Sequence, residues 1–156
     1  MRLSTRGRYG LRALLDLAAN EGTEPVSIKS ISKRQGISES YLAQLFAKLK
    51  KSGIIKSERG ANGGYRMCKD VKEVSIGEVL RSLEGNIEPV NCLAYGEHPT
   101  CKVYDICSGR IVWKRINDAV NHAVDGIMLS DIVEETVVYN EELLKRNEPI
   151  VRDCCN

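Results

Sequence analysis

The chain has 156 residues, of which 42% are hydrophobic and 28% are charged. A chain of this length forms one domain, or a small domain with an extension, and this composition can bury a core. No apolar run approaches the roughly 18 residues of a membrane span, and the first residues lack the apolar block of a secretory signal. These features argue against a secreted, membrane-spanning or largely disordered protein, and we expect a cytoplasmic one.

Charge is distributed unevenly along the sequence. Residues 1–70 contain 14 of the 23 Lys and Arg but 6 of the 21 Asp and Glu, which gives a net charge of +8. The remaining residues have a net charge of −6. A basic half joined to an acidic half indicates a polyanionic partner for the first half, although charges also cluster by chance on solvated faces.

The first half of the chain predicts three helices. Apolar residues recur at helical spacing from Thr5, which can cap the helix, to Ala19. Ser27 and Ser38 predict the starts of two shorter helices separated by Gly36. Two short helices joined by a tight turn form a helix-turn-helix, although a plain helical hairpin in a bundle has the same pattern.

The outward face of the third predicted helix carries side chains that can contact DNA. Hydroxyl, amide and ammonium groups donate hydrogen bonds and contact phosphates, and Gln44 can read adenine. The residues of this face are Ser40, Tyr41, Gln44, Lys48 and Lys51.

Residues 54–68 predict a β-hairpin around the loop Gly60-Ala61-Asn62-Gly63-Gly64. A hairpin directly after a helix-turn-helix is a wing. Its glycines permit a thin backbone with positive φ between phosphates, and Arg59 at its base suits a narrow minor groove. The alternative is an ordinary hairpin with an exposed arginine.

The second half predicts a fourth helix over 76–84, a loop without helical period over 86–107, and a long helix over 110–129. Nothing else in the chain covers the whole apolar stripe of the long helix. We therefore expect a dimerisation helix whose first half packs on its own domain. Ser130 predicts a final helix over 131–144.

The predicted fold is mainly α with a small β-wing. A winged helix-turn-helix DNA-binding domain occupies residues 1–85, and a cysteine-containing loop follows over 86–108. The dimerisation helix and the C-terminal helix span 109–146, and a disordered tail spans 147–156.

Six cysteines are many for a chain without a signal sequence, and a disulfide framework is disfavoured. Cys92, Cys101 and Cys107 are separated by eight and then five residues. Thiolates are soft ligands suited to iron–sulfur clusters or zinc, so the triplet indicates a metal site. Unpaired thiols and a disulfide switch are the alternatives. Cys68 is interpreted as a small buried apolar residue.

A fourth metal ligand is not evident in the sequence. A group from a partner subunit is one possibility. The candidates within the chain are Glu97, His98, Asp105 and His122.

Segments 1–9, 38–45 and 59–65, together with the cysteine triplet, resemble the winged-helix bacterial transcription regulators of the Rrf2 family. The resemblance covers residues 1 to about 140. It implies a homodimer that binds a double-stranded DNA operator. It also implies a 2Fe–2S cluster on Cys92, Cys101 and Cys107, loaded by iron–sulfur cluster donor proteins, and control of cluster-assembly genes. The predicted DNA-binding residues are Arg2, Thr5, Ser38, Ser40, Tyr41, Gln44, Lys48, Arg59 and Gly60.

Three positions depart from the family pattern. Arg110 and Arg8 stand where relatives carry a histidine or an acidic cluster ligand, and a protonated guanidinium is a poor ligand. Ala43 replaces an acidic residue that is thought to reject some operators when the cluster is absent. The spacing between Cys92 and Cys101 is longer than is usual in the iron–sulfur branch.

Two other classes of function are weighed against this one. A cluster-free regulator of cysteine metabolism, or a thiol- or nitric-oxide-sensing repressor, would share the fold without needing the cysteine triplet. A small redox enzyme or electron carrier would leave the wing and the basic half unexplained. No phosphate-binding loop, nucleophile elbow or zinc-protease motif occurs, and we predict that the protein is not an enzyme.

Overall fold

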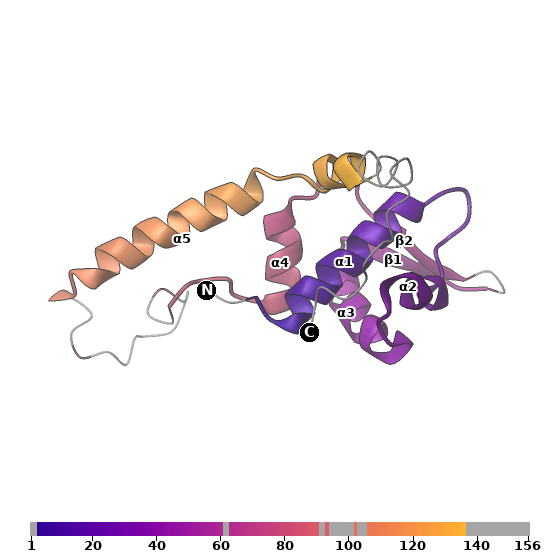
Figure 1. The fold of residues 1–156 in the computed structure, drawn as a ribbon, viewed down its shortest axis with the longest axis horizontal. Coiled ribbons are helices and arrows are strands. Elements are labelled where there is room, and N and C mark those ends of the chain that lie inside the picture. The colour runs from indigo at the N-terminus through magenta and orange to yellow at the C-terminus, as the bar shows by residue number, and fades with distance from the viewer. Residues whose placement is uncertain (1–2, 61–62, 91–92, 94–101, 103–105, 137–156) are drawn as a thin grey trace, which may run out of the picture.

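The computed structural model describes residues 3–60, 63–90, 93, 102 and 106–136. Figure 1 shows α4 standing between α5 on one side and the group of α1, α2, α3 and the hairpin on the other. The predicted fold, mainly helical with a small β-wing, is confirmed. The elements in chain order are α1 (Thr5–Asn20), α2 (Ile28–Gln35), α3 (Glu39–Lys51), β1 (Ile55–Glu58), β2 (Gly64–Met67), α4 (Ile76–Glu84) and α5 (Gly109–Asp125).

Serine side chains cap the first four helices. Ser27, Ser38 and Ser75 accept hydrogen bonds from backbone amides in the first turns of α2, α3 and α4, as their sequence positions predict. The predicted cap of α1 is wrong. Ser4 caps that helix by accepting from the Arg6 amide at 3.1 Å, and Thr5 is the first helical residue.

The hairpin is antiparallel, with Ile55 opposite Met67 in the ladder. The segment before α2 joins it, because the amide and carbonyl of Val26 pair with those of Tyr65 at 3.0 and 2.9 Å. Cys68 follows the last residue of β2 and is exposed, so the interpretation of a buried cysteine is wrong. The ladder ends one residue before it, and within the described part of the chain its side chain stays exposed.

One hydrophobic core joins α1, α2, α3 and α4. Phe46 is fully buried at its centre and meets the ring of Tyr65 edge-on, with 4.8 Å between ring centroids. Aromatic pairs prefer this edge-to-face geometry. The largest fully buried side chains include Leu14, Leu17, Ile31, Leu42, Leu45, Leu49, Ile54, Leu83 and Leu129.

The long helix ends earlier than its apolar pattern predicts. Instead of reaching residue 129, α5 stops at Asp125, and the chain returns to the core. The Ile76 amide donates to the Ile127 carbonyl, and the Leu129 amide donates to the Val74 carbonyl. These contacts take the place of helical hydrogen bonds. A further helix begins at 129, and its predicted part beyond 136 lies outside the described residues.

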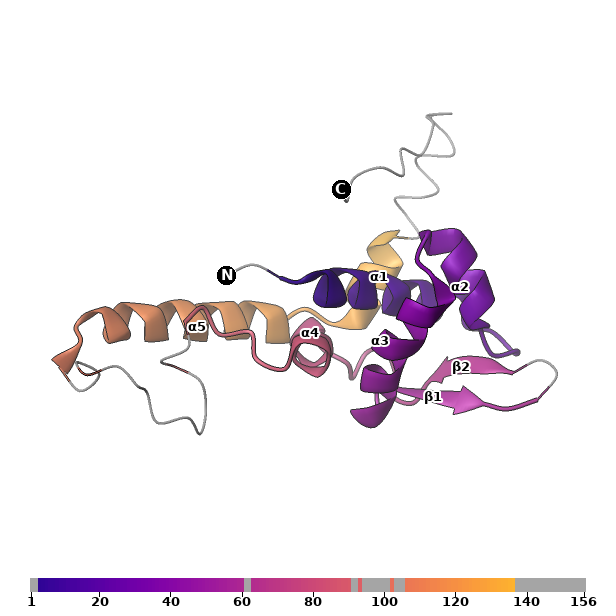
Figure 2. The same cartoon turned by 90° about the horizontal axis from the view of Figure 1, so that it is seen from below.

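The expectation that the first half of α5 packs on its own domain is also wrong. No residue of α5 is buried, and Ile111, Val112 and Ile116 are 61%, 55% and 40% exposed. Figure 2 shows the N-terminal end of α5 extending away from α4. The opposite end of α5 contacts α4 through Asn121 and Asp125. Within the described residues, no helix is long and apolar enough to cross a membrane.

Candidate DNA-binding surface and cysteine loop

The N-terminal ends of α1 and α3 lie side by side. The Tyr41 hydroxyl on α3 donates to the Thr5 hydroxyl at 3.5 Å, and the rings of Tyr41 and Tyr9 meet edge-on at 6.3 Å. The first turns of the two helices therefore form one surface. Amides at helix N-termini attract phosphate, so this surface suits a nucleic-acid backbone.

Polar side chains at the start of α3 point outward from the core. Ser38, Ser40 and Gln44 are exposed, while Leu42, Leu45 and Phe46 are buried on the opposite face. The Ser38 hydroxyl caps the helix and lies 3.4 Å from the Ser40 hydroxyl. Gln44 is thus exposed on the side of α3 away from the core, and base edges are read by exposed polar side chains of this kind.

Two arginines beside Tyr9, neither of them among the predicted DNA-binding residues, add positive charge to this surface. The guanidinium carbons of Arg8 and Arg12 lie 6.0 and 5.7 Å from the centre of the Tyr9 ring. These distances fall within the range of cation–π attraction. The two arginines are four residues apart on a helix, and this spacing is the sequence signal that they share one face.

Arg59 and Gly60 directly follow β1, at the start of the wing loop rather than at the base of the wing. Arg59 is exposed, and Gly60 has φ 141°, a conformation that a side chain would strain. By contrast, Arg66 on β2 is half-buried and already paired. It donates to the Gly22 and Thr23 carbonyls and lies 3.1 Å from the Glu58 carboxylate. Arg66 therefore fixes the wing against the loop before α2.

Lys48 on α3 reaches the C-terminal end of α4. Its ammonium donates to the Leu83 carbonyl at 2.8 Å, which caps the C-terminal end of α4. The DNA contact predicted for Lys48 stays a prediction, although its ammonium already has this partner within the protein. Arg2, the other predicted contact at the N-terminus, lies outside the described residues.

The Glu84 carboxylate joins the end of α4 to the start of α1. It accepts from the Ser4 amide at 2.9 Å, from the Ser4 hydroxyl at 2.7 Å and from the Gly7 amide at 3.0 Å. Burial opposes its ionisation, but the hydrogen bonds from Ser4 and Gly7 prevail and hold the pKa of Glu84 below its usual value. A side chain at Gly7 would collide with this carboxylate.

Of the cysteine triplet, Cys107 alone falls within the described residues. Its thiol is free and half-buried, two residues before α5. Cys92 and Cys101 lie outside the described residues, as do Glu97, His98 and Asp105. In the part of the chain that the structure describes, no three His, Cys, Asp or Glu side chains gather into a metal site.

His122 is separated from Cys107 by nearly the whole length of α5. At 1.5 Å rise per residue this corresponds to roughly 20 Å, too far for both side chains of one protomer to bind the same cluster. Three thiolates are nonetheless donors of the kind that iron–sulfur clusters use. The donor chemistry of the triplet fits such a group.

A recognition helix with an exposed polar face, followed directly by a wing with an exposed arginine, defines a winged-helix DNA-binding protein. The Rrf2 family, described as an iron-dependent transcriptional regulator, matches residues 3–135. The transcriptional regulator IscR of Cronobacter sakazakii is 36% identical over 148 residues, which cover 95% of this chain and 90% of that protein.

Two solved structures are similar in fold and sequence. CymR, the global cysteine regulator of B. subtilis, is 38% identical with a TM-score of 0.71, over 86% of this chain and 98% of its own. T. potens IscR is 35% identical with a TM-score of 0.69, over 87% of this chain and 88% of its own. The chain therefore belongs to the Rrf2 family. It is a transcription regulator and not an enzyme.

Proposed function

We propose that the protein is a homodimer that binds operator DNA in the cytoplasm. Its affinity for the operator depends on a 2Fe–2S cluster held by Cys92, Cys101 and Cys107. In this proposal it controls genes for iron–sulfur cluster assembly, and cluster donor proteins load it. The observation that carries the DNA-binding part is the surface shared by the starts of α1 and α3, beside the exposed wing arginine.

Each part of this surface has a separate task. Arg8, Arg59 and the helix N-termini contact phosphates or the narrow minor groove, and these contacts supply affinity. Ser40 and Gln44 reach the major groove, where a glutamine amide pairs with adenine. Thr5 and Tyr41 hold the two helices in register, so that phosphate contacts and base contacts fall on one stretch of duplex.

The two-fold symmetry of a dimer is supported by the exposed apolar side chains of α5. Ile111, Val112, Trp113 and Ile116 are exposed along it, which is costly for a helix that meets water alone. A second copy of α5 would cover them and place two recognition helices on two half-sites.

The cluster part of the proposal depends on the chemistry of three thiolates and on the likeness to proteins named IscR. A bound cluster would give the protein a group whose presence or oxidation state varies with iron, oxidants or nitric oxide. The half-buried Cys107 thiol precedes the first turn of α5, so a ligand there would bear directly on the start of that helix.

A cluster-free regulator of cysteine metabolism is the second candidate. It is favoured by the TM-score of 0.71 with the cysteine regulator CymR. A thiol- or nitric-oxide-sensing repressor of the same fold would use the cysteines without iron. Iron and sulfide analysis of anaerobically handled protein separates these candidates from the cluster regulator.

Two experiments test the proposal. Binding to a duplex from the protein's own promoter should weaken about 10³- to 10⁵-fold between about 50 and about 200 mM salt, if the dimer makes about 6–10 phosphate contacts. An affinity that does not change with salt concentration would contradict the proposal that this surface binds DNA through phosphate contacts.

Anaerobic cluster loading should give a visible chromophore in the wild type, and a variant with all three cysteines changed to alanine should lack it. An identical chromophore in that variant would rule out the triplet. The same loading should quench the fluorescence of Trp113, which is the single tryptophan of the chain.

A further inference from the structure

The last turn of α4 holds three other helices through three neighbouring residues. Arg81 contacts α5, the Leu83 carbonyl accepts from Lys48 of α3, and Glu84 accepts from Ser4 before α1. The partners come from the helix that carries the exposed apolar side chains and from both helices of the DNA-binding surface. A displacement of this turn would therefore affect both α5 and the helices of the DNA-binding surface.

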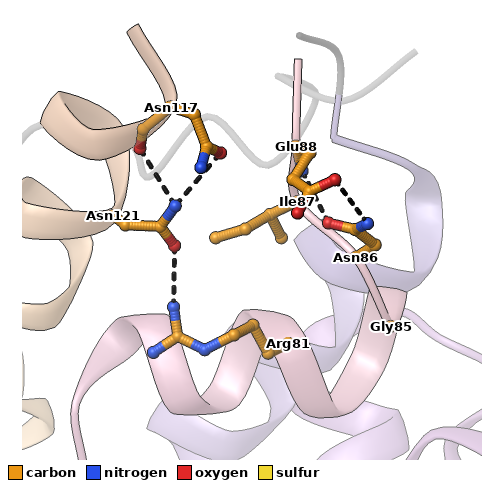
Figure 3. A pocket seen from close by; sticks show the side chains of 7 residues that line it. All are labelled: Arg81, Gly85, Asn86, Ile87, Glu88, Asn117 and Asn121. Carbon is orange, nitrogen blue, oxygen red and sulfur yellow. Dashed lines mark hydrogen bonds between the residues drawn. The ribbon is translucent and has the colours of Figure 1, made fainter. Parts of the chain in front are cut away.

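Arg81 supplies the side-chain hydrogen bonds from α4 to α5 within the described residues. The Arg81 guanidinium donates through Nη1 to Asn121 Oδ1 at 3.0 Å, and its Nη2 pairs with the Asp125 carboxylate. Figure 3 shows Asn121 held in turn by Asn117, whose backbone and side-chain oxygens accept from Asn121 Nδ2 at 2.9 and 3.1 Å. This arrangement turns the Asn121 oxygen toward Arg81. We call this group the Arg81 bridge.

The Arg81 bridge is closely packed on one side and borders a cavity on the other. A side chain at Gly77 would collide with the Asp125 carboxylate, so α4 and α5 approach closely there. On the other side, Figure 3 shows Arg81, Asn117 and Asn121 beside a cavity of about 550 Å³ that Ile87 and Glu88 also line. On this side the Arg81 side chain borders open space.

We propose that Arg81 is a positioning residue that couples α5 to the recognition helix, because the α4 turn that carries it also holds Lys48 of α3. The coupling rests on the proposed DNA binding, but it needs no cluster. Coupling between two sites is reciprocal, so DNA bound at α3 must also alter α5. Chains of packed side chains and hydrogen bonds can carry energetic coupling between two sites, and the described contacts supply one such chain.

Trp113 provides the readout. It is the single tryptophan, is 41% exposed, and belongs to the first turns of α5. Figure 1 shows that the N-terminal end of α5 is remote from α3 and the wing. Adding the promoter duplex to cluster-free protein should shift Trp113 emission. The Arg81→Gln variant should lose most of that shift while binding a labelled duplex within about threefold of the wild-type affinity, because Arg81 does not face the DNA surface.

Three variants make the test specific. Lys114→Gln removes the Lys114–Asp118 pair within α5, which lies at 2.7 Å and does not reach α4, so the shift should persist. Arg81→Lys keeps a charge opposite Asp125 and should restore part of the shift. Asn121→Ala breaks the bridge from the α5 side and should reduce the shift, which covers the case that Arg81→Gln folds poorly. Melting temperature and oligomeric state are measured for each variant.

Several outcomes would overturn the proposal. Wild-type protein that binds the duplex with unchanged Trp113 emission would show that α5 does not sense DNA. A full shift in both Arg81→Gln and Asn121→Ala would remove the bridge from the coupling. If Lys114→Gln lost the emission shift to the same extent, any substitution on α5 would abolish the shift, and the effect would not be specific to the Arg81 bridge. If the labelled duplex does not bind at all, both the proposed function and the coupling fail. If the duplex binds without the emission shift, the coupling alone fails.

Discussion

Asp16 on α1 and Arg34 on α2 form a forked ion pair that fixes the angle between the two helices. The Arg34 guanidinium donates through Nε to Asp16 Oδ1 at 2.9 Å and through Nη2 to Oδ2 at 2.7 Å. Asp16 is only 8% exposed, and Gln35 also donates to it at 3.0 Å. The hydrogen bond and charge of Asp16 raise the pKa of Arg34 against the opposing effect of burial. Arg34 therefore serves the fold rather than phosphate binding.

Replacing Asp16 with alanine should cost about 3 kcal/mol of unfolding free energy, since it removes an acceptor of charged hydrogen bonds and leaves a poorly solvated site. Urea denaturation measures this change. The matched control is Asp118→Ala, which removes an exposed pair at 2.7 Å within α5 and should cost at most about 0.5 kcal/mol. An equal loss of unfolding free energy in the two variants would show that the Asp16–Arg34 pair stabilises the fold no more than an exposed pair does.

Glu84→Gln should lower the unfolding free energy by about 1–2 kcal/mol at neutral pH, because an amide is a weaker acceptor for the Ser4 and Gly7 donors. The folded-state pKa of Glu84 lies below its usual value. The charged form therefore stabilises the fold fully above the usual pKa of about 4.3, and this contribution is lost as pH falls through the lower folded-state value.

The difference between wild type and Glu84→Gln should consequently shrink in acid, as measured by urea denaturation from neutral pH to about pH 3. Glu24→Gln is the control, since Glu24 is exposed and has no hydrogen bond or ion pair within the described residues. A difference that grows in acid would contradict the assigned role.

Lys48 and Arg59 should differ in their effect on the salt dependence of operator binding. Arg59→Ala should reduce the slope of log K against log salt by about 1 per protomer, because an exposed arginine at the wing contacts DNA backbone or groove. Lys48→Met should leave the slope unchanged, because its ammonium binds the Leu83 carbonyl. Fluorescence anisotropy over a salt series decides between these outcomes, and equal slope changes would place Lys48 on the DNA.

Ile116→Asp should convert the proposed dimer into monomers while the protein stays folded. Ile116 is 40% exposed in the single chain, so a carboxylate there remains solvated in a monomer but would be buried in the proposed interface. Light scattering coupled to gel filtration gives the mass, and far-ultraviolet circular dichroism gives the helix content. Lys114→Gln on the same helix should leave the mass unchanged, and a dimeric Ile116→Asp protein would remove α5 from the interface.

The sequence predicted the elements of the DNA-binding part well because their signals are local. A serine before an apolar helical period marks a helix start wherever the helix later packs, and Ser27, Ser38 and Ser75 do cap α2, α3 and α4. The hairpin was equally local, with its two strands on either side of a glycine-rich loop. The long helix was overextended because Ile127 and Leu129 continue the apolar pattern although they contact Ile76 and Val74.

The sequence by itself determined the class of the protein: a basic half with a helix-turn-helix and a wing, followed by a cysteine triplet and an apolar helix. Only the tertiary structure decided which polar side chains remain free for a ligand. Lys48, Arg81 and Glu84 bind partners 35, 40 and 80 residues away in the chain. Periodicity specifies which face of a helix is buried, but the packing of whole helices against one another sets which distant side chains meet across that face.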